Sequence, residues 1–271
     1  MFIAHNNDIS ESQYKPLIQF DKKKVLSKSN GEISLRSNIC PHQMSLISLK
    51  EGTGNRVCPY HGWSFDINGN PVSSGRTDHY CKNNYALKTF DLYQFKDLLF
   101  DTNINNKELH WLDLSKMQLK EQRVDRVRAN NKIIMDVFLD VDHIECVHSG
   151  VYNQIGLPNI NQVQWHYYDW GSLQLVAKGE EYGAAWLAVY PGTMIEWQPG
   201  ALFITEAVSI NNYETDVHVF KYSDDDSEWK LNESVWETAW AQDKEQAELI
   251  TGFTNNNLEE SKKHFRQWLT K

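Results

Sequence analysis

The sequence contains Cys40-Pro41-His42 and, after fifteen intervening residues, Cys58-Pro59-Tyr60-His61-Gly62-Trp63. Each half offers one thiolate and one imidazole. Two loops of this composition suit a [2Fe–2S] cluster in which the two cysteines bind one iron and the two histidines bind the other. A Cys2His2 set also suits zinc, but zinc sites commonly pair Cys with Cys and His with His in separate halves. The pattern therefore favours a [2Fe–2S] cluster with Cys40, His42, Cys58 and His61 as ligands.

The run from Pro59 to Asp66 resembles the second ligand loop of Rieske proteins almost residue for residue. After His42, ring-hydroxylating members of this group usually have Arg-Gly, whereas Gln43 and Met44 follow here. Respiratory-chain Rieske proteins carry an extra cysteine in each loop, and Met44 and Tyr60 stand at those positions. The resemblance thus implies a Rieske-type cluster outside the respiratory branch.

The chain is predicted to have two domains, an all-β domain over residues 1–101 and an α+β domain over 108–271. Turn signals such as Ser29-Asn30-Gly31 separate short strands in the first, and the polar stretch 102–107 is the expected boundary. In the second, a helical stripe over 131–148 precedes a run of strands. Those strands are expected at 173–178, 184–189, 194–197, 201–210 and 217–222, and two helices near 227–251 and 258–269.

A second candidate metal site lies in the predicted helix 131–148. His143 and His148 are separated by four residues, and Asp140 stands three residues before the first of them. Asp140 and His143 would share a helix face. The two histidines would lie about 140° apart on an ideal helix, so they can bind one metal only if the helix loosens or ends near them.

The third expected ligand is Asp243, in the run Ala241-Gln242-Asp243-Lys244-Glu245. It follows Trp236 and Trp240 on the apolar stripe of the predicted helix 227–251, where a buried carboxylate without a partner would be costly. Two histidines and one carboxylate are the set that non-haem Fe(II) uses when it activates O2. An ordinary surface Asp on a helix is the alternative interpretation.

Together, the two motifs resemble the Rieske non-haem iron oxygenases, and the chain is similar to a compact α-subunit of that family with a helix-grip-like catalytic domain. The resemblance implies a [2Fe–2S] cluster, a mononuclear Fe(II) and O2 as co-substrate. It also implies a homotrimer in which Asp140 links His61 of one chain to His143 of the next. Asp140 would then assist catalysis by electron transfer without binding iron.

The expected activity is O2-dependent hydroxylation of a small organic substrate, of the monooxygenase or demethylase type. Electrons would come from a separate NAD(P)H-dependent reductase or ferredoxin, because the sequence has no G-x-G-x-x-G fingerprint. Two alternatives stay open: an arene cis-dihydroxylating dioxygenase, and an electron-transfer or binding protein without catalytic iron. Three irons per chain would indicate the oxygenase, and two would indicate the carrier.

Composition limits the other partners. The chain has 271 residues and a formal net charge of −9, which argues against nucleic acid because phosphate contact needs clustered Lys and Arg. It contains no long apolar run typical of a membrane span and no signal-peptide pattern at its N-terminus. We therefore expect a cytoplasmic protein that does not bind membranes.

Overall fold

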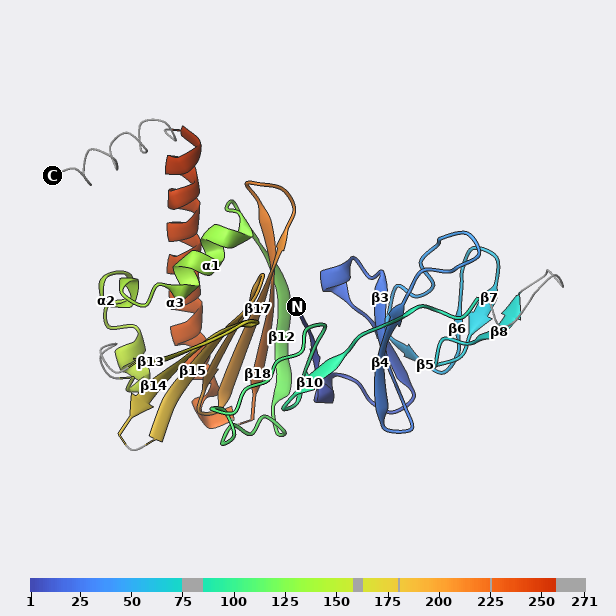
Figure 1. The fold of residues 1–271 in the computed structure, drawn as a ribbon, viewed down its shortest axis with the longest axis horizontal. Helices are drawn as coiled ribbons and strands as arrows, with labels where there is room; N and C mark the ends of the chain where they lie inside the picture. The colour runs from blue at the N-terminus through green and yellow to red at the C-terminus, as the bar shows by residue number, and fades with distance from the viewer. Residues whose placement is uncertain (75–84, 158–162, 180, 225, 257–271) are drawn as a thin grey trace. The chain divides into compact units, whose positions relative to one another are not determined.

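The computed structural model describes residues 1–74, 85–157, 163–179, 181–224 and 226–256. It divides into two compact units, one of Phe2–Ser115 and one of Lys116–Lys271 together with Met1. Figure 1 shows the strand-rich character of both units. Among the described helices, none combines the length and the apolar character that a membrane-spanning helix needs.

Within the described residues 1–74 and 85–115, the first unit forms three small antiparallel sheets, as expected for an all-β domain. A five-stranded sheet has the order β5-β2-β3-β4-β9, and two three-stranded sheets have the orders β6-β7-β8 and β1-β11-β10. Two short 3-10 helices, Asn6–Asp8 and Ile18–Phe20, connect strands. The strands are β1 (Phe2–His5), β2 (Gln13–Pro16), β3 (Lys24–Ser29), β4 (Glu32–Ser37), β5 (Gly52–Thr53), β6 (Arg56–Val57), β7 (Trp63–Phe65), β8 (Pro71–Ser74), β9 (Thr89–Phe90), β10 (Tyr93–Phe95) and β11 (Leu98–Phe100).

Residues 108–115, predicted from the sequence to lie in the second domain, belong to the first unit in the structure. Leu109 and Leu114 are fully buried, and His5 Nε2 makes a 3.0 Å hydrogen bond to the carbonyl oxygen of Leu114. Asn7 also donates its side-chain amide to the carbonyl oxygen of Ser115 at 2.9 Å. These contacts hold the connecting segment against the end of β1 and the turn that follows it. The predicted domain limits, 1–101 and 108–271, stay a prediction.

The described part of the second unit contains one antiparallel sheet of seven strands in the order β12-β18-β17-β16-β15-β14-β13. The five strands predicted between residues 173 and 222 are confirmed as β14 to β18. Two further strands were not predicted, because β12 carries charged side chains on both faces and β13 mixes polar and aromatic residues that are mostly half-buried. The strands are β12 (Gln118–Val127), β13 (Val163–Tyr168), β14 (Gly171–Lys178), β15 (Glu181–Val189), β16 (Thr193–Gln198), β17 (Ala201–Ser209) and β18 (Thr215–Ser223).

The helices of this unit differ from the prediction in one respect. The helix predicted over 131–148 is interrupted, because α1 (Asn131–Leu139) ends at Leu139 and α2 (His143–Val147) begins after a break. α2 ends just before His148, which is the helix end near the histidines that binding of one metal would require. Asp140 has extended backbone angles, φ −81° and ψ 97°, so Asp140 and His143 do not share a helix face. A 3-10 helix, Tyr152–Ile155, follows. The last described helix, α3 (Asp226–Asn256), contains the predicted 227–251 helix, and the one predicted at 258–269 lies outside the described residues.

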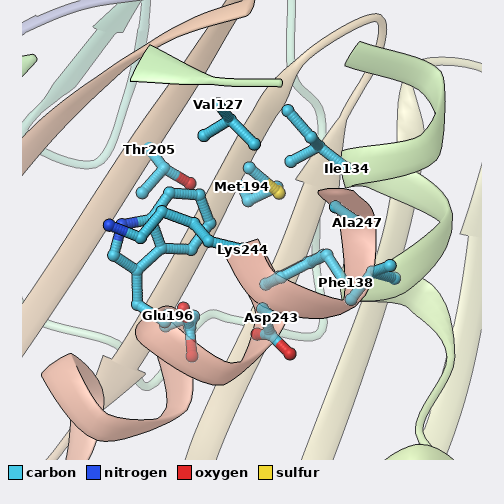
Figure 2. Close-up of a pocket in the computed structure, with 11 residues that line it drawn as sticks. Val127, Ile134, Phe138, Met194, Glu196, Thr205, Asp243, Lys244 and Ala247 are labelled. Carbon is cyan, nitrogen blue, oxygen red and sulfur yellow. The ribbon is translucent and has the colours of Figure 1, made fainter. Parts of the chain in front are cut away.

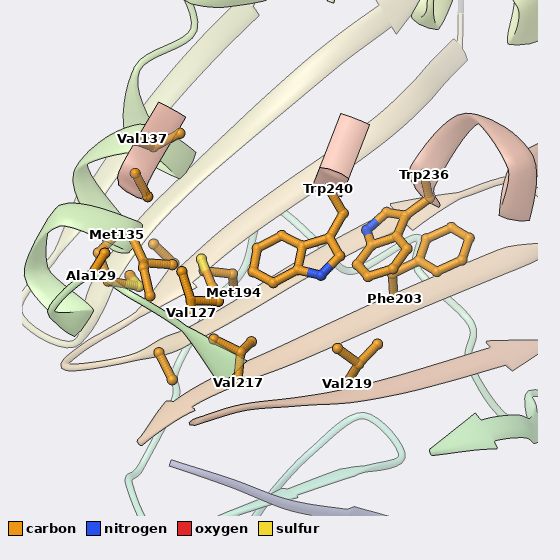
Figure 3. Packing of buried hydrophobic residues seen from close by; sticks show 14 of the residues in the cluster. Val127, Ala129, Met135, Val137, Met194, Phe203, Val217, Val219, Trp236 and Trp240 are labelled. Atoms are coloured by element: carbon orange, nitrogen blue, oxygen red, sulfur yellow. The ribbon is translucent and has the colours of Figure 1, made fainter. Parts of the chain in front are cut away.

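Helices α1 and α3 lie on one side of the sheet (Figure 1) and bury a shared apolar core against it. Aromatic rings of α3 carry much of this contact. Trp236 stacks on Phe203 of β17 with ring centroids 5.0 Å apart, and Trp240 stacks on Trp236 at 6.0 Å (Figure 3). Both indoles also donate hydrogen bonds to acids on the sheet, Trp236 to Glu196 and Trp240 to Asp125, each at 2.8 Å. These contacts fix the position and rotation of α3.

A buried ammonium stabilises the same helix against β12 and β18. Lys221 is 1% exposed and contacts three carboxylates, those of Glu121 at 2.7 Å, Glu233 at 2.9 Å and Glu237. Arg123 adds ion pairs to Glu121 at 2.7 Å and Glu237 at 2.6 Å. Because the lysine lies between the three acids, they form a charge network and not a vacant cation site.

Replacing Lys221 by Met should destabilise the protein by about 2–3 kcal/mol, because three partly buried carboxylates would then lose their central cation. The free energy of unfolding from urea titration measures this. Lys230→Met, an exposed position on the same helix, is the matched control and should change stability by about 0.5 kcal/mol or less. A Lys221→Met variant as stable as the control would contradict the role given to this network.

Candidate metal centres

The two loops of the first unit that carry the Cys-His motif have matching backbone geometry. In the first, the Met44 amide donates to Cys40 O at 2.9 Å and the Cys40 amide donates to Ser45 O at 2.8 Å. In the second, the Gly62 amide donates to Cys58 O at 3.0 Å and the Cys58 amide donates to Trp63 O at 2.7 Å. The fourth residue after each cysteine is left-handed, with φ 56° at Met44 and 76° at Gly62.

These loops bring the four expected cluster ligands together. Cys40 and Cys58 are 1% and 2% exposed, and burial, together with the neighbouring Cys58 thiol, raises the pKa of Cys40. The imidazoles lie further out, with His42 half-buried and His61 exposed, and their ring centroids are 4.8 Å apart. The ring of Trp63 stacks on His42 at 4.9 Å.

This arrangement fits a [2Fe–2S] cluster. Metal binding would stabilise the thiolate form of both buried cysteines, and it would offset the raised pKa of Cys40. The Nδ1 atom of His42 is buried and has no hydrogen-bond partner among the described residues, which is a position that a cluster iron would satisfy. The inner thiols and outer imidazoles correspond to the two ends of such a cluster.

The second unit brings together the other three expected ligands. His143 begins α2, His148 follows its last residue, and Asp243 lies on α3. The Nε2 atoms of the two histidines are 3.0 Å apart, and Asp243 Oδ1 lies 3.2 Å from His143 Nε2 and 2.9 Å from His148 Nε2. His148 lies just beyond the end of this five-residue helix, so the angular separation that two such residues have on an ideal helix does not apply. The side chains of His143 and His148 therefore converge.

The tautomer of His148 suits metal binding. Its Nδ1 lies 2.8 Å from Gln242 Oε1, an acceptor, so Nδ1 carries the proton and Nε2 presents a lone pair toward His143 and Asp243. Burial alone would raise the pKa of Asp243, but the hydrogen bonds and charges of the two histidines lower it. Two imidazole nitrogens and one carboxylate oxygen on one side of a site form the set that non-haem Fe(II) prefers.

Asp140 does not reach His143 in the structure. Its side chain is exposed, and its Oδ1 accepts a hydrogen bond from the Asp142 amide at 3.1 Å. His143 Nδ1 is buried and lacks a hydrogen-bond partner within the described ranges. The structure therefore assembles His143, His148 and Asp243 but leaves Asp140 outside this group.

A narrow pocket adjoins Asp243 between α1, α3 and the sheet (Figure 2). Its polar lining includes Glu196 of β16, whose Oε1 accepts the hydrogen bond from Trp236. Burial and the charge of Asp243 raise the pKa of Glu196 to about 7, against the opposing effects of Trp236 and His148. Sequence reasoning did not select Gln242 or Glu196. Gln242 could have been found from its position next to Asp243, whereas no local sequence feature of β16 marks Glu196.

Comparisons with known proteins agree with this organisation. Residues 1–91 match the family model of the Rieske [2Fe–2S] domain. A putrescine 2-hydroxylase of Bordetella bronchiseptica is 23% identical over 266 residues, covering 79% of this chain and 60% of the relative. A carnitine monooxygenase oxygenase subunit of Acinetobacter pittii is 22% identical over 202 residues, covering 62% and 53%. The chain thus spans 60% of the length of the first of these curated relatives and 53% of the second.

Solved structures share the fold over nearly the whole chain. The quaternary ammonium Rieske monooxygenase CntA in complex with L-carnitine superposes with a TM-score of 0.75 at 15% identity, covering 96% of this chain and 80% of that one. Naphthalene 1,2-dioxygenase from Rhodococcus bound to indole gives 0.71 at 16% identity, covering 95% and 78%. The predicted fold class, a Rieske domain followed by an α+β domain with an antiparallel sheet, is confirmed.

The hydrogen bond from His148 to Gln242 allows a test of the second centre. Gln242→Leu removes the acceptor that fixes the tautomer of His148, so affinity for Fe(II) should fall by about 10–100-fold. Competition with a chelator measures this affinity, and Gln246→Leu, one turn further along α3, is the control. An unchanged affinity in Gln242→Leu would show that His148 needs no such orientation.

Proposed function

We propose that this chain, which carries a Rieske [2Fe–2S] domain and the fold of the Rieske oxygenases, is the terminal oxygenase component of a Rieske non-haem iron system. It hydroxylates a small organic substrate with O2 and electrons supplied by another protein. The observation that carries this proposal is the convergence of His143, His148 and Asp243 within 3.2 Å of one another beside a pocket. An electron-transfer protein without catalytic iron would not need these three side chains to converge.

The residues of the chain have separate tasks in this proposal. Cys40, His42, Cys58 and His61 hold the cluster, and His143, His148 and Asp243 hold a single iron. The cluster supplies single electrons, and the iron supplies a site where O2 is activated beside the substrate. Gln242 keeps the proton of His148 on Nδ1, away from the metal. The apolar lining of the pocket limits the access of water to the site.

Monooxygenation is favoured over dihydroxylation of an arene. The relatives named above are a hydroxylase and a monooxygenase, and they match this chain by sequence over a large part of its length. Naphthalene 1,2-dioxygenase shares the fold, so an arene dioxygenase is the second candidate. The polar side chains of Glu196 and Lys244 in the pocket lining disfavour it, because an arene offers no hydrogen bond to a buried carboxyl group.

The electrons come from a separate NAD(P)H-dependent reductase or ferredoxin, since the sequence holds no nucleotide fingerprint of its own. The cytoplasm, where NAD(P)H is available and thiols stay reduced, is the proposed location. A homotrimer is the proposed assembly, with Asp140 between His61 of one chain and His143 of the next. Asp140 and His61 are both exposed, which leaves them accessible to another chain.

Asp243→Ala should lower the iron content from three to two per chain and abolish substrate-dependent O2 uptake, because two imidazoles alone hold Fe(II) poorly. The visible absorption of the cluster should persist. Metal analysis and O2 uptake with a surrogate reductase are the measurements, and Glu245→Ala, an exposed acid on the same helix, is the control. Turnover in Asp243→Ala, or two irons per chain in the wild type, would contradict the proposal.

Asp140→Asn should leave three irons per chain but slow electron transfer by about 10–100-fold, since an amide holds two imidazoles less firmly than a carboxylate does. The rate is read by reducing the cluster and following its reoxidation with substrate and O2 in a single turnover. Asp136→Asn, exposed on α1, is the control. Reoxidation at the wild-type rate, or full activity of a monomer in sedimentation, would show that Asp140 is an ordinary surface acid.

A further inference from the structure

Arg56, in the first unit, is a buried cation whose donors are mostly unused. It is 1% exposed, and its Nε and Nη1 atoms have no hydrogen-bond partner among the described residues. Its Nη2 donates one long hydrogen bond, at 3.4 Å, to the carbonyl oxygen of Asp66, and its Cζ lies 5.7 Å from the centroid of the Tyr14 ring. A buried charge is costly unless another charge compensates for it. A negative charge that forms close to Arg56 would therefore be stabilised.

The charged groups around Arg56 do not balance it. Burial, followed by the second cation Arg36, lowers the pKa of Arg56 to about 10, so the guanidinium keeps its charge at neutral pH. Tyr14 and Asp66 oppose this effect, but the carboxylate of Asp66 accepts hydrogen bonds from the backbone and side-chain amides of Asn70, at 2.7 Å and 3.0 Å. Within the part of the chain that the structure describes, no acid forms an ion pair with Arg56.

The side chain of Arg56 lies on the face of its sheet that carries the cysteines of the cluster site. Arg56 of β6 pairs with Phe65 of β7, and the ladder continues to Cys58, whose amide donates to the Trp63 carbonyl oxygen at 2.7 Å. Paired residues share a face of the sheet, and so do residues two apart on one strand. Cys58, Trp63 and Phe65 belong to one buried core, which also contains Cys40. Arg56 thus begins about 7 Å along the strand from Cys58, beside this core.

Reduction of the cluster would create the negative charge that Arg56 lacks. Two thiolates and two neutral imidazoles leave an oxidised [2Fe–2S] centre without net charge, and one added electron makes it negative. A cation buried beside an apolar core attracts that charge more strongly than an exposed cation does, because water and salt screen it less. The rings of Trp63 and Phe65 provide such surroundings.

We propose that Arg56 raises the reduction potential of the [2Fe–2S] cluster and thereby favours its reduction by the redox partner. One electron passes from the partner to the cluster, and no bond to Arg56 forms or breaks. Arg56 acts through its charge and contributes no ligand. The competing role is structural, as an anchor for the Asp66 carbonyl and the Tyr14 ring.

The test is a potentiometric titration of the cluster-loaded protein, followed by its visible absorption. Arg56→Met and Arg56→Gln both remove the charge, but glutamine keeps a donor for the Asp66 carbonyl. Each should shift the equilibrium about 10-fold toward the oxidised cluster, which is a fall of about 59 mV for one electron. The fall should persist at high salt, because the charge is buried. Lys88→Met, which removes an exposed cation next to Leu87 of the same core, is the control and should change the potential little.

Three results would overturn the inference: a wild-type potential in either Arg56 variant, a fall that disappears at high salt, or failure of the cluster to assemble in both variants. A wild-type potential in Arg56→Gln alone would assign the effect to the hydrogen bond, and failed assembly would assign Arg56 to folding. The absorption spectrum of the oxidised cluster should stay unchanged, and an altered spectrum would show that the ligands had moved. Because Arg56 acts on the cluster, these results leave the proposed mononuclear iron site to its own test.

Discussion

The fold of the second unit depends on the packing of Trp236 and Trp240 between α3 and the sheet. The ring of Trp236 stacks on Phe203 and the ring of Trp240 stacks on Trp236. Their indole N–H groups donate to Glu196 and Asp125, so the helix can neither slide nor rotate freely. Asp243 lies less than one turn beyond Trp240. The carboxylate of Asp243 must approach two imidazoles that lie about a hundred residues earlier in the chain. The fixed position of α3 makes this approach possible.

Trp236 also connects the candidate iron site to the charge network around Lys221. The indole nitrogen binds Glu196 at the pocket, while Lys221 Nζ and the Arg123 guanidinium each lie 5.8 Å from the centroid of its ring. One side chain therefore contacts the acid that lines the pocket and the cations that hold α3 to β12 and β18. The stability of the helix and the position of Glu196 depend on the same ring.

The sequence contained enough information to predict the Rieske motif, five of the seven strands and the stripe that places Asp243, because each of these signals is local. The break between α1 and α2 could not be predicted. The stripe formed by Ile134, Val137, Val141 and Ile144 is continuous, and only the backbone angles of Asp140 reveal that the helix ends. The positions of Gln242 and Glu196 beside the site follow from tertiary packing between α2, α3 and β16, for which no short-range pattern exists.

The paired backbone hydrogen bonds of the two Cys-His loops have a consequence for redox chemistry. Each loop is closed on both sides of its cysteine, and a left-handed residue completes the turn, so the four side chains extend from rigid supports. A centre held in this way can gain or lose an electron while its ligands move very little. Small nuclear rearrangement means a low reorganisation barrier, which lets an electron arrive and depart rapidly even when the driving force is slight.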